Sequence, residues 1–210
     1  MGANMKNTSR GKTRFPVLTP SRLTPAQRRL ARSLLAGPRG EGKADREAVR
    51  RLLRRGPFNA WMRSPELGEH LQKAGAYIRF KTSLPKRLNE FAILITARHW
   101  TSQFEWYAHE PIARKAGIAE GVIAAIRAGR RPALSDPDQQ AVYDYAAELH
   151  ETHTVSQQTY ARAHERFGTL GVVQLTALLG YYTMVAMTLN THAIPLPEGA
   201  APPLPLRALK

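Results

Sequence analysis

The chain has 210 residues, of which 43% are hydrophobic, and a formal net charge of +15 at pH 7. This length and hydrophobic content predict a folded domain with a buried core, and they exclude a chain that is disordered throughout. The absence of cysteine excludes disulfides, thiolate metal sites and a cysteine nucleophile. No charged segment followed by an apolar stretch lies near Met1, so we expect no secretory signal and a cytoplasmic protein.

The positive charge is concentrated in the first 60 residues. They hold fifteen Lys and Arg against three Asp and Glu, whereas residues 61–210 hold sixteen against thirteen. A basic segment can bind nucleic acid, anionic lipid or an acidic partner. It can also be a solvated extension or a cover for a neighbouring subunit. The sequence favours a solvated extension or a cover for a neighbouring subunit, because no RNP aromatic cluster, zinc-finger spacing or helix-turn-helix pattern accompanies the charge.

Two segments are predicted before the main domain. Residues 1–20 form a flexible basic tail, whose composition also fits a transit peptide. Residues 21–55 form a basic helical extension. Within it, the Thr-Pro-Ala-Gln run at 24–27 is a capping box that begins a helix, and Gly37-Pro38 ends it. A second short helix runs to Arg55, before Gly56-Pro57.

Residues 56–192 are predicted as one helical domain. Ser-Pro-Glu at 64–66 begins a helix that runs to Phe80, and Ser-Leu-Pro at 83–85 begins the next. That helix breaks near Thr101. Ser-Gln-Phe-Glu at 102–105 is again a capping-box pattern and begins the following helix.

Four further helices are expected at 119–128, 135–152, 156–168 and 169–190, and no alternating β pattern is present. The fold class is therefore all-α. Residues 169–190 carry no charge and approach the length of a membrane span. We do not assign a span, because Gly and Gln interrupt the stretch; a buried core helix or a subunit interface is favoured. Residues 193–210 form a Pro-rich tail, extended from Ile194 to Leu206, that packs on the surface or on a partner subunit.

The titratable residues around the break at Thr101 are the candidate active site. Glu105 and His109 are four residues apart, so they lie on the same helix face. An antiparallel helix pair would bring Glu90 close to them. A carboxylate beside an imidazole can orient it for general acid/base catalysis. Aromatic walls would come from Phe104, Trp106 and Tyr107.

Three runs carry a resemblance to a known family: Arg-Leu-Asn-Glu-Phe-Ala-Ile-Leu at 87–94, Gln-Phe-Glu-Trp-Tyr-Ala-His at 103–109 and Ile-Ala-Arg-Lys-Ala-Gly-Ile at 112–118. Together they resemble the carboxymuconolactone decarboxylase family, including its AhpD-like alkylhydroperoxidase branch. The resemblance covers about 56–190. It implies an AhpD-like helical bundle that assembles as a homo-oligomer, a trimer or a hexamer.

The resemblance also separates two chemistries. In the redox branch a Glu precedes Cys-x-x-Cys and a His; Glu90 and His109 match the Glu and the His, and Ser102 and Glu105 fall at the cysteine positions. Serine forms no disulfide and a carboxylate is no resolving group, so peroxidase activity is disfavoured. The decarboxylase branch implies an enzyme without cofactor or metal that moves protons on a small unsaturated carboxylic acid or lactone as carbon dioxide leaves.

On that interpretation Glu90 and His109 perform the acid/base work, and Glu105 orients His109 or binds substrate. Substrate binding is further expected from three residues: Ser102, Trp106 and Arg98. Arg98 would hold a substrate carboxylate. A non-catalytic assembly protein, or one that binds nucleic acid through residues 1–60, is the remaining alternative.

Each candidate also has a purely structural interpretation. Ser102 and Glu105 could serve only as a helix cap, in which case the helix dipole would lower the pKa of Glu105. His109 could be a core histidine, and Glu90 could form an ion pair with Arg87 or Arg98. His150 and His153 have a His-x-x-His spacing, which differs from that of zinc proteases, so a solvated helix end is expected there.

Overall fold

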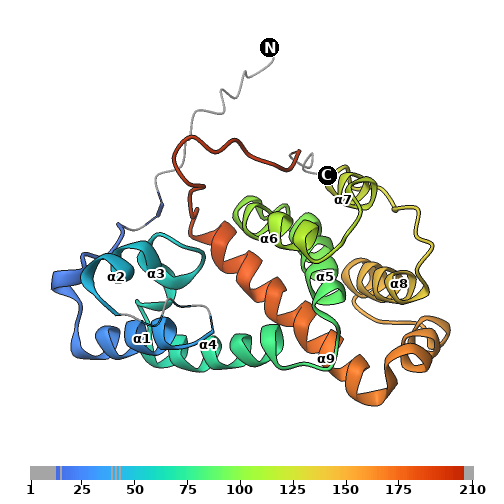
Figure 1. Cartoon of the computed structure of the whole chain (residues 1–210), viewed down its shortest axis with the longest axis horizontal. Helices are drawn as coiled ribbons and strands as arrows, with labels where there is room; N and C mark the ends of the chain where they lie inside the picture. Colours follow the sequence, from blue (N-terminus) through green and yellow to red (C-terminus); the bar gives the residue numbers. More distant parts are fainter. Residues whose placement is uncertain (1–12, 15, 39, 41, 43, 206–210) are drawn as a thin grey trace, which may run out of the picture.

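The computed structural model describes residues 13–14, 16–38, 40, 42 and 44–205 (Figure 1). Within these residues the chain forms nine α-helices and one short 3-10 helix, and it has no strand. The predicted all-α class is therefore confirmed. The first twelve residues, and Leu206 to Lys210, lie outside the described part, so the expectations for them stay untested.

The N-terminal part is a layer of helices, seen on the left of Figure 1 and along the bottom to its centre. Thr24 and Gln27 form the predicted capping box at its first α-helix. A one-turn helix after Gly56-Pro57 escaped prediction because four residues carry no measurable periodicity. The elements of this layer are η1 (Pro20–Arg22), α1 (Pro25–Ala36), α2 (Arg46–Leu53), α3 (Phe58–Trp61) and α4 (Pro65–Phe80).

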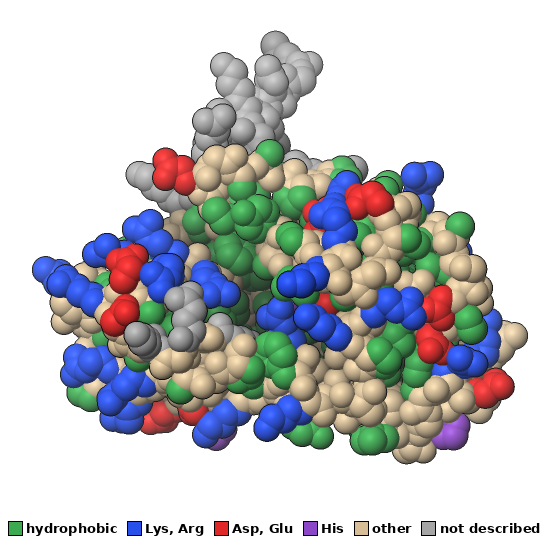
Figure 2. Space-filling model, in the orientation of Figure 1, with side chains coloured by type: hydrophobic (Ala, Val, Ile, Leu, Met, Phe, Trp, Pro, Cys, Tyr) green, Lys and Arg blue, Asp and Glu red, His purple; other side chains and the backbone are tan. Residues whose placement is uncertain are grey.

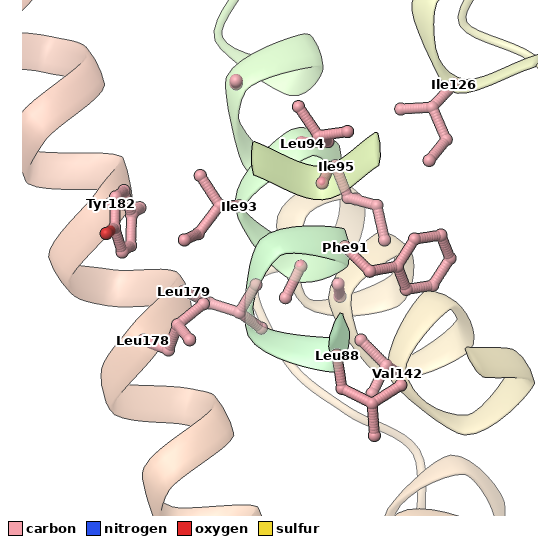
Figure 3. Packing of buried hydrophobic residues seen from close by; sticks show 14 of the residues in the cluster. Leu88, Phe91, Ile93, Leu94, Ile95, Ile126, Val142, Leu178, Leu179 and Tyr182 are labelled. Carbon is pink, nitrogen blue, oxygen red and sulfur yellow. The ribbon is translucent and has the colours of Figure 1, made fainter. Parts of the chain in front are cut away.

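The remaining helices surround α5, which is buried at every position from Leu88 to Arg98. Figure 3 shows Ile93 on the side of α5 that faces Leu179 and Tyr182, with Phe91 on the side that faces Val142. Such burial needs apolar residues all round, and this explains the weak amphipathic pattern of the segment. The elements are α5 (Lys86–His99), α6 (Gln103–Lys115), α7 (Glu120–Arg127), α8 (Pro137–Thr152) and α9 (Gln157–Thr191).

Helix α9 crosses the molecule between the two parts (Figure 1). Gly168, with φ +62° and ψ 179°, divides it into the two segments that were predicted. By length and composition alone, α9 is the one helix of the described residues that could cross a membrane, and half of its most apolar window is buried. Core helices pass the same test, and α9 packs against α5 and α8.

Both terminal segments pack on their own chain. The tail was predicted to be flexible up to residue 20, but Arg14 N donates to His192 O at 3.1 Å and Leu18 N donates to Asn59 Oδ1 at 3.0 Å. At the other end, Gln103 Nε2 donates to Leu204 O, and Leu204 N donates to Gln103 Oε1, both at 2.9 Å. Leu204 is buried. The C-terminal segment therefore lies against α6.

Candidate active site

The turn between α5 and α6 sets the position of the candidate residues. Thr101 adopts φ +47°, Ser102 N donates to Ala97 O at 2.8 Å, and Thr101 N donates to Arg98 O at 3.1 Å. This pair of bonds is a Schellman motif, which ends α5 and satisfies its last carbonyls. The Ser102 N–H is thereby engaged. The predicted capping box is wrong, because Glu105 has no free N–H to accept from and Ser102 makes no side-chain cap bond.

Glu105 is consequently a buried carboxyl group without a partner. Its side chain is 2% exposed, and neither carboxyl oxygen has a hydrogen-bond partner among the described residues. Burial without compensation disfavours the charged form, and it raises the pKa of Glu105 well above its ordinary value of 4.5. The effect is opposite to the lowering expected from the helix dipole, because desolvation outweighs the dipole at this position.

Glu90 and His109 form the pair that the spacing predicted. Glu90 Oε2 accepts a hydrogen bond from His109 Nδ1 at 2.7 Å, and both side chains are buried. The second carboxylate oxygen of Glu90 lies 3.8 Å from an Arg79 nitrogen. Arg79 on α4 therefore replaces Arg87 and Arg98 as the cation beside Glu90. With Nδ1 engaged by Glu90, the remaining ring nitrogen of His109 is Nε2.

His109 and Glu105 line the same cavity, of about 510 Å³, between α2–α3, α6 and α9. Figure 2 shows the hollow between α2–α3 and α6, with hydrophobic side chains in its depth and Lys and Arg side chains around it. Glu90 lies behind His109 and lines a neighbouring cavity of about 550 Å³. Arg79 and Phe80 line both cavities and separate them.

Tyr182 is a site residue that the sequence analysis missed. Its ring lies edge-on to His109, with 5.2 Å between ring centroids, and it lines the 510 Å³ cavity. Burial raises the pKa of its hydroxyl. The signal was available, because Tyr182 follows Leu175, Leu178 and Leu179 at helical spacing, but that spacing alone indicates a core position.

Three predicted substrate-binding residues lie outside this cavity. Trp106 is fully buried in the core, where its Nε1 donates to Glu110 Oε2 at 2.8 Å. Ser102 is also fully buried, and its hydroxyl has no partner among the described residues. Their assignment as cavity residues is corrected, because successive residues of a helix face different directions and α6 turns Phe104, Glu105 and His109 to the cavity.

Arg98 also faces away from the cavity. Its Nη1 donates to Thr101 Oγ1 at 3.2 Å, and it lines a separate small cavity with His99 and His150. Its proposed contact with a substrate carboxylate is therefore corrected. The arginines beside the cavity of His109 are Arg79, Arg54 and Arg55.

His150 is half-buried and not solvated as predicted, whereas His153, just after the end of α8, is exposed as expected. The His150 ring stacks on His99 with 4.6 Å between centroids, and its Nε2 lies 3.0 Å from Thr96 Oγ1. Burial, with the neighbouring His99, lowers its pKa to about 4. Among the described residues, no group of three or more His, Asp or Glu side chains is arranged to hold a metal ion.

The order and packing of these helices define an all-helical protein, and its fold resembles that of an AhpD-like protein in a solved structure. A crystal structure of a protein of unknown function from Agrobacterium tumefaciens, provisionally named as the antioxidant defence protein AhpD, superimposes with a TM-score of 0.58. The match is 14% identical in sequence and covers 66% of this chain and 95% of that one. No family model matches the sequence, and no curated protein matches it significantly. At this identity the likeness shows the fold alone.

Proposed function

We propose that this protein is an acid/base enzyme of the carboxymuconolactone decarboxylase type, acting on a small unsaturated carboxylic acid or lactone. The observation that carries the proposal is the unpaired, buried carboxyl of Glu105 in one cavity wall with the Glu90-bonded imidazole of His109. A proton donor and a proton acceptor thus face the same space.

The two groups have different roles because their environments differ. Glu90 holds the His109 ring through Nδ1, so Nε2 is left to carry a proton from water to Glu105, and the carboxylate behind the ring stabilises the imidazolium that forms. Burial raises the pKa of Glu105 well above its ordinary value, which favours the protonated carboxyl. It is therefore the donor. Tyr182 orients the imidazole by its edge-on contact.

Decarboxylation needs one proton at carbon. As the bond to the carboxylate breaks, its electron pair passes into the conjugated system of the substrate and carbon dioxide leaves. Glu105 then delivers its proton to the carbon that carries the negative charge, and the proton is replaced from water through His109. The sum is the loss of carbon dioxide and the gain of one proton, without any change of oxidation state in the protein.

Thiol-dependent peroxide reduction is not supported for this chain, since it contains no cysteine. The provisional antioxidant name belongs to the Agrobacterium protein and is not carried over to this chain. A thiol-dependent peroxidase assay on this protein should give no turnover, and robust activity would contradict the proposed chemistry.

The direct test is a panel of unsaturated carboxylic acids and lactones, including a carboxymuconolactone, in deuterium oxide. Carbon dioxide release and a product with one solvent deuterium at carbon are expected for the true substrate. Glu105→Gln and His109→Ala should each lower turnover by about a hundredfold or more. Ser102→Ala, outside the cavity, is the matched control. Turnover that survives both substitutions would contradict the proposal, as would a panel without any release or deuterium exchange.

A further inference from the structure

The cavity beside His109 has aromatic walls supplied by four separate elements. A volume of about 510 Å³ is that of a pocket for a small organic ligand. Side chains from α3, α4, α6 and α9 contribute the rings, namely Phe58, Trp61, Phe80, Phe104, Tyr107, Tyr181 and Tyr182. Flat apolar surfaces on several sides favour a planar, aromatic or conjugated ligand.

The charges that line the cavity are almost all positive. Arg54 and Arg55 line it, and neither guanidinium has a carboxylate partner among the described residues. Arg79 adds a third cation, partly balanced by Glu90 at 3.8 Å. The single acidic residue of the lining is Glu105, which is neutral when it carries its proton. Such a lining favours an anion.

The N-terminal layer holds these arginines in place. Leu52 and Leu53 are buried directly before them, and Gly56, at φ +50°, turns the chain so that α3 continues the wall. Arg54 and Arg55 themselves are exposed at the cavity rim. Anchored backbone and exposed guanidinium groups are the arrangement expected for recognition of a ligand that enters from solvent.

We propose that the cavity binds an aromatic or conjugated carboxylate, with its ring between the aromatic walls and its carboxylate at Arg54 and Arg55. The proposal uses the cavity of the proposed function but not its proton transfers. The basic N-terminal extension is then a substrate-recognition element. It contributes the two cations, and α3, which follows it, adds Phe58 and Trp61 to the aromatic wall.

The test is calorimetric titration of the full chain with 2-naphthoate and with the neutral 2-naphthamide. Wild type should bind 2-naphthoate more tightly than the amide. The double substitution Arg54→Gln, Arg55→Gln should weaken 2-naphthoate about tenfold or more and leave the amide unchanged. Arg46→Gln with Arg50→Gln removes the same charge from exposed positions of α2 outside the cavity, and should leave both affinities unchanged.

Tyr107→Ala, at a partly exposed wall residue, should weaken both ligands alike. Equal affinity of wild type for acid and amide, no binding of 2-naphthoate, or equal loss in the two double variants would overturn the proposal. Glu105→Gln should retain 2-naphthoate binding. If wild type binds 2-naphthoate but decarboxylates no acid or lactone of the panel, the proposed function is contradicted and the proposed carboxylate-binding role of Arg54 and Arg55 is retained.

Discussion

Single residues decide the chemistry of this cavity. Glu90 and Glu105 are both buried carboxyls, but Glu90 accepts a hydrogen bond from His109 and lies near Arg79, whereas Glu105 has no partner among the described residues. Two carboxyls in different environments are a recurrent arrangement for separate base-supporting and acid roles. The difference arises from the Ser102 N–H, which bonds to Ala97 O and is thus unavailable to Glu105.

The isolation of Glu105 predicts a pH-dependent stability. Because its pKa is raised in the folded state, the folded protein retains a proton that the unfolded chain loses, and stability falls as pH rises from the unfolded pKa of about 4.3 towards the folded one. Glu105→Gln removes this penalty. Across that window, urea unfolding should show the variant gaining about 1.4 kcal/mol per pH unit relative to wild type.

Glu66→Gln is the control, since Glu66 is exposed on α4. Its stability difference from wild type should change little with pH. A Glu105→Gln difference that is equally flat would show that Glu105 ionises in the folded protein as it does in the unfolded chain.

At the scale of residues, the sequence predicted the Glu90–His109 pair but not the burial of Glu105 without a hydrogen-bond partner. Helix periodicity placed Glu105 and His109 on one face, and the expectation of an antiparallel helix pair, with the family resemblance, brought Glu90 to His109. The Ser102–Glu105 cap is absent because of how α5 ends, with Thr101 in the left-handed region. Threonine rarely adopts that conformation, so the sequence did not predict this turn. Arg79 and Tyr182 reach the site from α4 and α9, and no local pattern reports such long-range contacts.

At the scale of helices, the bend in α9 allows its charged first segment and its apolar second segment to run in two directions. Gly168 combines φ +62° with ψ 179°, a backbone region accessible essentially to glycine alone. The sequence predicted this division because glycine ends helices. It could not predict the direction of each half, which depends on the packing of α5 and α8 against them.

Gly168→Ala should therefore destabilise the protein by about 1–3 kcal/mol, measured by thermal or urea unfolding. Gly180→Ala is the matched control in the same helix, where an added Cβ meets nothing within 4 Å. It should stabilise the protein by about 0.5–1 kcal/mol. Effects of the same sign and size would show that the backbone at Gly168 is not the constraint inferred from its dihedral angles.

For the whole molecule, the basic N-terminal layer and the C-terminal segment both complete the cavity. Helix α3 forms part of its wall, and Pro197 lines it as well. The sequence predicted residues 21–55 as an extension and 193–210 as a tail, since their composition differs from that of the helical domain, and it placed the segment of α3 inside that domain. Their packing could not be predicted, because the contacts join residues about 100 positions apart, as between Gln103 and Leu204.

Gln103→Ala should release the C-terminal segment by removing both hydrogen bonds to Leu204. The expected loss is about 1–3 kcal/mol of stability, with faster amide hydrogen exchange between residues 194 and 205. Gln157→Ala, at an exposed position of α9, should leave that exchange unchanged. Unaltered protection of the segment in Gln103→Ala would mean that Leu204 burial alone holds it.

The most direct test of the proposed site is the titration of Glu105 itself. In protein labelled with carbon-13 at the Glu carboxyl carbons, one resonance that is missing from Glu105→Gln should titrate well above the ordinary value of 4.5. A Glu105 resonance that titrates at or below that value in the folded protein would contradict its role as the proton donor.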